Sequence, residues 1–130
     1  MIWIEILTAV ALLQYIYFGA LVGNARDKYG VSAPAITGHE MFERYYRVQM
    51  NTLELLIVFL PALWLAARYW SPVAMATLGT VYVVGRFVYL KSYTQDPASR
   101  SLGYGLSFGP AVLLLLAGLT GSVLAAIKSA

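Results

Sequence analysis

The sequence predicts an all-α integral membrane protein, folded as a left-handed, up-down bundle of four transmembrane helices. Two observations predict this fold. Of the 130 residues, 60% are hydrophobic and only 12% are charged, whereas soluble domains are about half apolar and a quarter charged. The apolar residues also form four segments, each close to the ~20 residues that a helix needs to cross a bilayer. We expect residues 1–130 to form a single four-helix domain.

The first two spans contain few interruptions. The first span covers residues 2–22, and the polar residues that interrupt it are Glu5, Thr8 and Gln14. Because no basic region precedes its apolar run, we expect a retained span and not a cleaved signal peptide. The second span covers residues 53–70 and contains Pro61. Neighbouring helices can satisfy the carbonyl that proline frees, so we expect Pro61 to kink this helix without ending it.

The third span covers residues 72–90, and the fourth covers residues 102–127. The fourth is rich in glycine, and two of its pairs have the small-xxx-small spacing that lets helix backbones approach closely: Gly105 with Gly109, and Gly118 with Ser122. We therefore consider close helix packing at both pairs, with an ordinary membrane-helix abundance of glycine as the alternative.

Basic residues at the ends of the spans predict the orientation in the membrane. The first and third connections are flanked by most of them, namely Arg26, Lys28, Arg44, Arg47, Lys91 and Arg100. By the positive-inside rule, these connections face the cytoplasm and both termini face the opposite side. The basic residues are scattered and do not form a cluster, so we expect no nucleic-acid partner.

The sequence excludes several kinds of chemistry. It contains no cysteine, so disulfides and a protein thiol nucleophile are absent. The single histidine, His39, cannot form a histidine cluster, and we expect no bound metal.

Polar residues continue from the first connection into the second span as one helical stripe. In "ERYYRVQMNTLE", this stripe has the spacing i, i+3, i+7 and i+10, and consists of Arg44, Arg47, Asn51 and Glu54. Charged residues in a membrane helix face a protein interior or a wet cavity. One interpretation is a buried network in which Arg47 pairs with Glu43 or Glu54. The other is a site for a polar ligand.

A second stripe supports the ligand site. "GRFVYLKSY" places Arg86, Tyr89 and Tyr93 at i, i+3 and i+7, and Arg100 precedes the fourth span. We expect the two spans and their loop to bring one set of polar side chains to the same depth: Arg47, Gln49, Asn51, Glu54, Tyr89, Tyr93 and Arg100. Arginines bind carboxylates in bidentate geometry, a glutamate suits an ammonium group, and tyrosine hydroxyls suit carboxylates or a thiol. The expected ligand is small and zwitterionic, with more than one carboxylate.

These motifs resemble those of a known family. "FERYYRVQMNTLE" (residues 42–54) and "GRFVYLKSYTQDPASR" (residues 85–100) are similar to the two signatures of the membrane-associated proteins in eicosanoid and glutathione metabolism, the MAPEG superfamily. The loop "NARDKYGVSAPAITGHEMFER" resembles that of the microsomal glutathione transferases and the leukotriene-conjugating synthase. The resemblance implies a short, bacterial-type member that forms a homotrimer. It also implies a glutathione pocket between neighbouring subunits, near the cytoplasmic surface.

Matched residue by residue, the resemblance implies a set of glutathione contacts: Arg26, Arg47, Gln49, Asn51, Glu54, Tyr89 and Tyr93. It implies that Arg100 faces the glutathione sulfur and is the catalytic residue. Two positions depart from the synthase-like branch. This chain has Leu55 where that branch has a tyrosine, and Asp27 where it has a second arginine. A general transferase is therefore expected in preference to a leukotriene synthase.

The resemblance implies a membrane-bound glutathione transferase that acts in detoxification, with glutathione as co-substrate and lipophilic electrophiles as acceptors. A glutathione peroxidase activity towards lipid hydroperoxides accompanies it in this interpretation. Two alternatives lie within the superfamily: a non-catalytic protein that presents lipids, and a glutathione-dependent lipid isomerase. A small transporter or channel subunit is a third alternative, but its charges should continue through the membrane. The outer halves of the third and fourth spans carry none.

Overall fold

The computed structural model describes residues 1–130 and is entirely helical. Its helices are α1 (Ile2–Tyr29), α2 (Glu40–Tyr69), α3 (Pro72–Gln95) and α4 (Ser101–Ser129), with a short 3-10 turn, η1 (Pro97–Ser99), before α4. All four long helices have the length and composition to cross a membrane. Three of the predicted spans each lie within one of these helices, and the second extends one residue past α2 to its C-cap, Trp70. Four helices able to cross a membrane are therefore confirmed, while the handedness and assembly of the bundle stay predictions.

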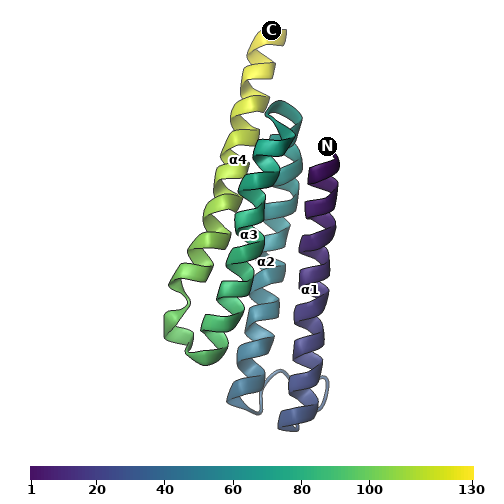
Figure 1. The fold of residues 1–130 in the computed structure, drawn as a ribbon, viewed down its shortest axis with the longest axis vertical. Coiled ribbons are helices and arrows are strands. Elements are labelled where there is room, and N and C mark those ends of the chain that lie inside the picture. The colour runs from purple at the N-terminus through teal and green to yellow at the C-terminus, as the bar shows by residue number, and fades with distance from the viewer.

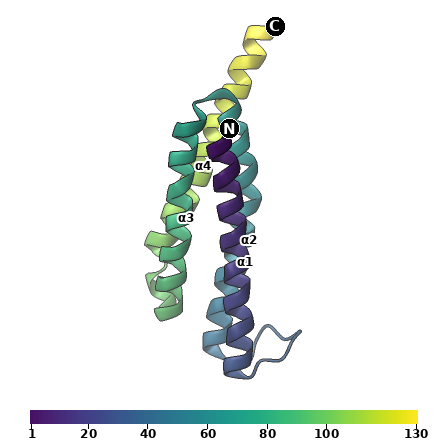
Figure 2. The ribbon, with the colours of Figure 1, turned by 45° about the vertical axis from the view of Figure 1, so that its right-hand side comes forward.

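The helices alternate in direction along the chain (Figure 1). Both termini lie at one end of the bundle, and the α1–α2 loop and η1 lie at the other. α2 and α3 pack between α1 on one side and α4 on the other. The α1–α2 loop extends away from the bundle, and the last turns of α4 project beyond the other helices (Figure 2). All the predicted polar stripes therefore belong to the end that carries the long loop.

α2 begins well before its apolar span, which is why the first stripe is helical. His39 is its N-cap, and the Nδ1 atom of His39 accepts a hydrogen bond of 3.1 Å from the Met41 amide. Such a cap satisfies one of the free N–H groups at a helix start. The helix then continues through Pro61 to Tyr69, so the prediction that this proline does not end the helix is confirmed.

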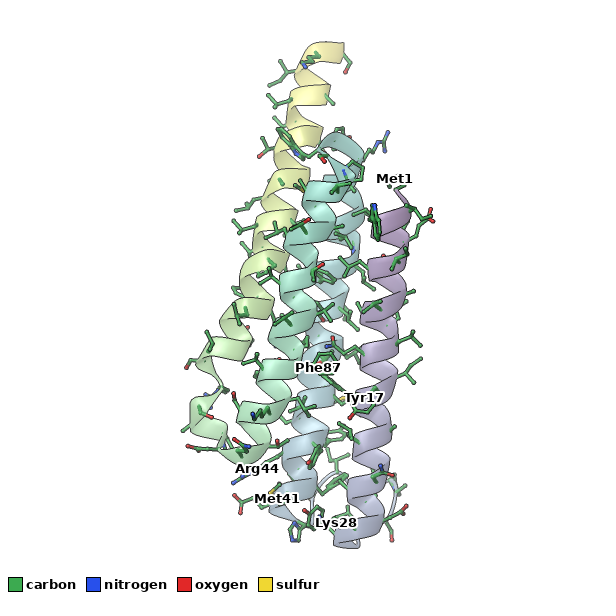
Figure 3. All side chains as sticks on the ribbon, viewed as in Figure 1. Met1, Tyr17, Lys28, Met41, Arg44 and Phe87 are labelled. Atoms are coloured by element: carbon green, nitrogen blue, oxygen red, sulfur yellow. The ribbon has the colours of Figure 1, made fainter.

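The hydrophobic core runs through the middle of the bundle, between all four helices. Its fully buried members include Ile4, Phe59, Leu63, Tyr82 and Leu114. Many apolar side chains point outward instead (Figure 3). On one such surface Tyr17 of α1 lies beside Phe87 of α3, with ring centroids 6.5 Å apart. An outer surface of this kind suits lipid contact or contact with other membrane helices.

Glycine lets α3 and α4 approach at backbone distance near the polar end. A Cβ atom added to Gly103 would lie 2.4 Å from the backbone nitrogen of Tyr89. One added to Gly85 would lie 2.7 Å from the carbonyl carbon of Leu106. No larger residue fits at either position without moving one of the helices.

The predicted glycine pairs are only partly correct. An added Cβ at Gly118 would lie 2.7 Å from Leu65, so this glycine packs closely as expected. Gly105 and Gly109 have no neighbouring atom within 4 Å, and the prediction of close packing there is wrong within this chain. The reason is helical phase: Gly105 follows Gly103 by two residues and therefore points to nearly the opposite face of α4.

Candidate functional site

A polar pocket of about 500 Å³ opens between α2, α3 and α4 at the end that carries the long loop. Its volume lies in the range of ~300–1,000 Å³ typical of small-molecule sites. The residues that line it are Arg47, Asn51, Glu54, Tyr89, Tyr93, Arg100 and Tyr104. Six of these seven are residues that the sequence predicted to bind a ligand, and they meet at one depth as expected.

α2 contributes an ion pair to the wall of this pocket. Arg47 Nη1 lies 3.1 Å from Glu54 Oε1, and the two side chains are 48% and 59% exposed. Glu43 is engaged elsewhere, because its carboxylate accepts a hydrogen bond from the Gly38 amide. The pairing that the buried-network interpretation predicted therefore exists, but it is accessible. A ligand carrying both a carboxylate and an ammonium group could exchange partners with it.

α3 contributes two stacked tyrosines. The rings of Tyr89 and Tyr93 lie 5.4 Å apart and are nearly parallel, with an angle of 18° between their planes. Tyr89 is buried at 3% exposure, whereas Tyr93 is half-buried. The close approach of Gly103 to the Tyr89 backbone fixes the depth of this pair relative to α4.

Behind the pocket lies Arg86, which is fully buried. Its guanidinium carbon lies 4.5 Å from the ring centroid of Tyr89. Its Nη1 atom donates to Asn51 Oδ1 at 2.7 Å, and its Nε atom donates to Ser107 Oγ at 2.8 Å. Arg86 thereby joins α2, α3 and α4. The sequence placed Arg86 on the stripe with Tyr89 and Tyr93, but did not identify these partners.

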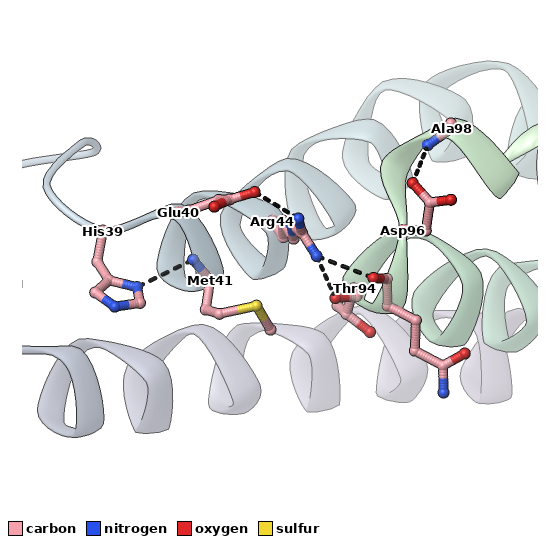
Figure 4. A network of polar contacts seen from close by, with 8 residues as sticks. His39, Glu40, Met41, Arg44, Thr94, Asp96 and Ala98 are labelled. Carbon is pink, nitrogen blue, oxygen red and sulfur yellow. Dashed lines mark hydrogen bonds and ion pairs between the residues drawn. The ribbon is translucent and has the colours of Figure 1, made fainter.

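Arg44 does not enter the pocket but fixes its rim. Its Nη1 atom donates to the carbonyl oxygens of Thr94 (2.9 Å) and Gln95 (3.1 Å), and its Nη2 atom pairs with Glu40 (Figure 4). These carbonyls belong to the last turn of α3, where a cation is favourable for the helix dipole. The contact holds the end of α3 next to α2.

Arg100 stands at the opposite rim, just before α4. It is exposed, and its Nη1 atom donates to the Pro97 carbonyl oxygen at 3.0 Å. The turn before it is ordered by Asp96, whose Oδ1 atom accepts a hydrogen bond of 3.1 Å from the Ala98 amide (Figure 4). The η1 turn therefore places Arg100 in the lining of the pocket that Tyr89 and Tyr93 also line.

Two predicted contacts lie away from this pocket. Gln49 packs against α1, where its Nε2 atom lies 2.9 Å from a Cβ built on Gly19. Within one chain Gln49 therefore points away from Arg47, because two residues turn a helix by about 200°, and its contact with glutathione stays a prediction. Arg26 donates to the Ala35 carbonyl oxygen at 2.6 Å and lies over the ring of Phe42. It belongs to the loop side of the bundle.

Tyr104 is the pocket residue that the sequence analysis missed. It follows Arg100 by four residues on α4, and this spacing puts two side chains on one helix face. This spacing from Arg100 is the sequence signal that could have identified Tyr104. Its ring stacks on Phe108 with 5.4 Å between centroids, so its phenol is held at the pocket wall.

A second cavity, of about 310 Å³, lies between α1 and α3 towards the end that bears the termini. Most of its lining is apolar, including Trp3, Ile6, Val10 and Val73. It offers no charged group. The polar pocket combines two arginines with a glutamate and two tyrosines, and is therefore the candidate site for the expected zwitterion.

Comparison with known proteins agrees with these features. Residues 4–120 match the model of the MAPEG family. The chain is 44% identical to an uncharacterized protein of Synechocystis, over 92% of this chain and 87% of that protein. It is 41% identical to human microsomal glutathione S-transferase 2, over 89% of this chain and 81% of the human protein. It is 37% identical to bovine leukotriene C4 synthase, over 72% of this chain and 62% of the synthase. The chain belongs to the MAPEG family.

Proposed function

We propose that this protein is a membrane-bound glutathione transferase that conjugates glutathione to lipophilic electrophiles. The observation that carries the proposal is the pocket, which combines Arg47 and Arg100 with Glu54 and two tyrosines. Glutathione has two carboxylates, one ammonium group and a thiol, and this set of side chains complements them. The name of the human relative, a microsomal glutathione S-transferase, supports the same co-substrate.

In this proposal, Arg47 and Asn51 bind carboxylate oxygens, and Glu54 accepts hydrogen bonds from the ammonium group. Tyr89 and Tyr93 donate hydrogen bonds across the pocket. Arg26 and Gln49 are directed away from it in a single chain. They complete the site in a homotrimer, in which a neighbouring subunit brings them to the open side of the pocket.

Arg100 stabilises the glutathione thiolate. A thiol with a pKa of ~8.5 is only a few per cent ionised at neutral pH, and the thiolate is the nucleophile. A nearby arginine lowers the pKa of an acid by ~1–3 units. The gain in thiolate is partly offset, because nucleophilicity falls with pKa with a slope of ~0.4–0.5. The net gain is a few-fold, so positioning of the two reactants, worth up to ~7–11 kcal/mol, is the larger contribution.

The acceptor reaches the thiolate from the bilayer. The sulfur attacks an electrophilic carbon and forms a C–S bond, and the proton lost from the thiol leaves with the displaced group or returns to the adduct. With a lipid hydroperoxide, two glutathione molecules are oxidised to the disulfide while the hydroperoxide is reduced to the alcohol and water. The pocket faces the cytoplasm in this proposal, because basic residues flank the first and third connections.

The decisive experiment uses the protein purified in detergent. Isothermal titration with reduced glutathione should give saturable heat, and an aryl halide should be conjugated at a rate that depends on protein concentration. Cumene hydroperoxide measures the peroxidase activity in parallel. Binding without either turnover would favour a lipid-presenting protein, and absence of binding would refute the proposal.

A further inference from the structure

The buried arginine behind the pocket has no acidic partner. Arg86 is fully buried within α3, yet the two ion pairs of the chain are Arg44–Glu40 and Arg47–Glu54. A charged residue at membrane depth is costly, and it usually pairs with another charge or marks a functional site. Its Nη2 atom is buried and has no hydrogen-bond partner. The cation therefore lies behind Asn51 and Tyr89, two residues of the pocket lining, without a counter-charge of its own.

The groups around Arg86 are neutral acceptors. Thr52 Oγ1 donates its proton to the Val48 carbonyl oxygen (2.8 Å) and accepts from Arg86 Nη1 (3.3 Å). Ser107 Oγ donates to the Gly103 carbonyl oxygen (2.7 Å) and accepts from Arg86 Nε. Both hydroxyl protons are thus directed to carbonyls of their own helices, and only lone pairs remain for the guanidinium.

The same contact fixes the Asn51 amide. Arginine has donors only, so the amide atom 2.7 Å from Arg86 Nη1 must be the oxygen. Asn51 also lines the pocket. With its oxygen held by Arg86, the part of the amide left for a ligand is the NH₂ group. Asn51 therefore presents donors, which suit a carboxylate and not an ammonium group.

We propose that Arg86 is a positioning residue for the ligand. It orients Asn51 as a donor towards a carboxylate of glutathione, and the negative charge of that carboxylate compensates the buried guanidinium. This proposal rests on the proposed function, because the ligand must be an acid. It also explains why a buried cation is surrounded by neutral groups: a carboxylate in the protein would remove the attraction for the ligand.

Arg86→Lys tests the proposal, because lysine keeps the charge but lacks the planar fork that reaches both Asn51 and Ser107. We expect the Kd for reduced glutathione, measured by titration calorimetry in detergent, to rise about tenfold, which corresponds to 1.4 kcal/mol. The KM for glutathione should rise equally, while kcat changes little, since the lost interaction acts on binding. The matched control is Arg68→Lys, an exposed arginine near the opposite end of α2. It should leave Kd unchanged.

Asn51→Asp provides a second test that does not require loss of folding. A carboxylate at this position pairs with Arg86, so thermal stability should be kept or raised, whereas glutathione affinity should fall at least tenfold. A purely structural role for Arg86 would lower the melting temperature and the number of binding-competent molecules of Arg86→Lys, but leave their Kd unchanged. That result, or unchanged or tighter binding by Asn51→Asp, would overturn the role of Arg86. Failure of the unsubstituted protein to bind glutathione would instead refute the proposed function itself.

Discussion

Replacing Gly103 by alanine should damage the pocket from behind, although the substitution adds only one methyl group. The new Cβ would lie 2.4 Å from the Tyr89 nitrogen and 2.5 Å from its Cα atom, where ordinary contacts begin near 3.4 Å. Both obstacles are backbone atoms, so no side-chain rotation relieves the clash. α3 and α4 must separate by about 1 Å at this level.

The magnitude follows from two opposing effects. Alanine is favoured over glycine within a helix by about 1 kcal/mol, whereas overpacking costs about 1–3 kcal/mol. A displacement of 1 Å also moves Arg100 and Tyr104 relative to Tyr89, and misplacement on that scale can reduce turnover about 10²-fold. We therefore expect Gly103→Ala to melt at a lower temperature and to lose most of its conjugating activity.

Gly105→Ala is the matched control, since it lies on the same helix and has no neighbouring atom within 4 Å. It should keep activity and melt at the same or a higher temperature. The assays are thermal unfolding in detergent and glutathione conjugation, measured on all three proteins side by side. If Gly103→Ala equals Gly105→Ala in both, the close backbone contact between α3 and α4 does not exist as described.

Three further substitutions test separate parts of the site. Arg100→Ala should lower turnover while glutathione affinity survives. Its pH–rate profile should move about 1–3 units higher, because the thiol loses the cation that lowers its pKa. An unmoved profile would show that Arg100 does not stabilise the thiolate. Glu54→Gln should weaken glutathione binding by about tenfold or more, as expected for a lost charge-assisted hydrogen bond of ~1.5–3 kcal/mol. An equal Kd in calorimetry would argue against a contact between Glu54 and the ammonium group. Arg44→Ala should speed amide hydrogen exchange over residues 92–96, since α3 loses the donor to its last carbonyls; mass spectrometry showing unchanged exchange would contradict this role.

Local sequence patterns were sufficient to predict the helices and most of the pocket. The apolar segments are long enough to identify each span, and helical spacing correctly grouped Arg47, Asn51 and Glu54. Tyr104 was predictable by the same spacing from Arg100, but only if α4 was assumed to begin at Ser101. Periodicity therefore succeeded wherever the relevant neighbours lie on one helix.

Features that depend on contacts between helices were not predictable in this way. Whether Gly103 or Gly105 faces α3 depends on how α4 is rotated about its axis. The two glycines are only two residues apart, yet one packs against α3 and the other has no neighbouring atom within 4 Å. The partners of Arg86 come from α2 and α4, and no spacing within α3 indicates them. That Gln49 packs against α1 likewise depends on a neighbouring helix, and no spacing within α2 indicates it.

The contacts of Arg86 and Gly103 also make the base of the pocket more rigid than its edge. Its base is tied to three helices by hydrogen bonds and a backbone contact, whereas Arg47, Glu54 and Arg100 extend from the edge as exposed, long side chains. A stiff base rejects molecules that differ slightly in the part it touches, while a compliant edge adapts to many shapes. Such an enzyme would demand one unvarying co-substrate and still accept a chemically diverse set of second reactants.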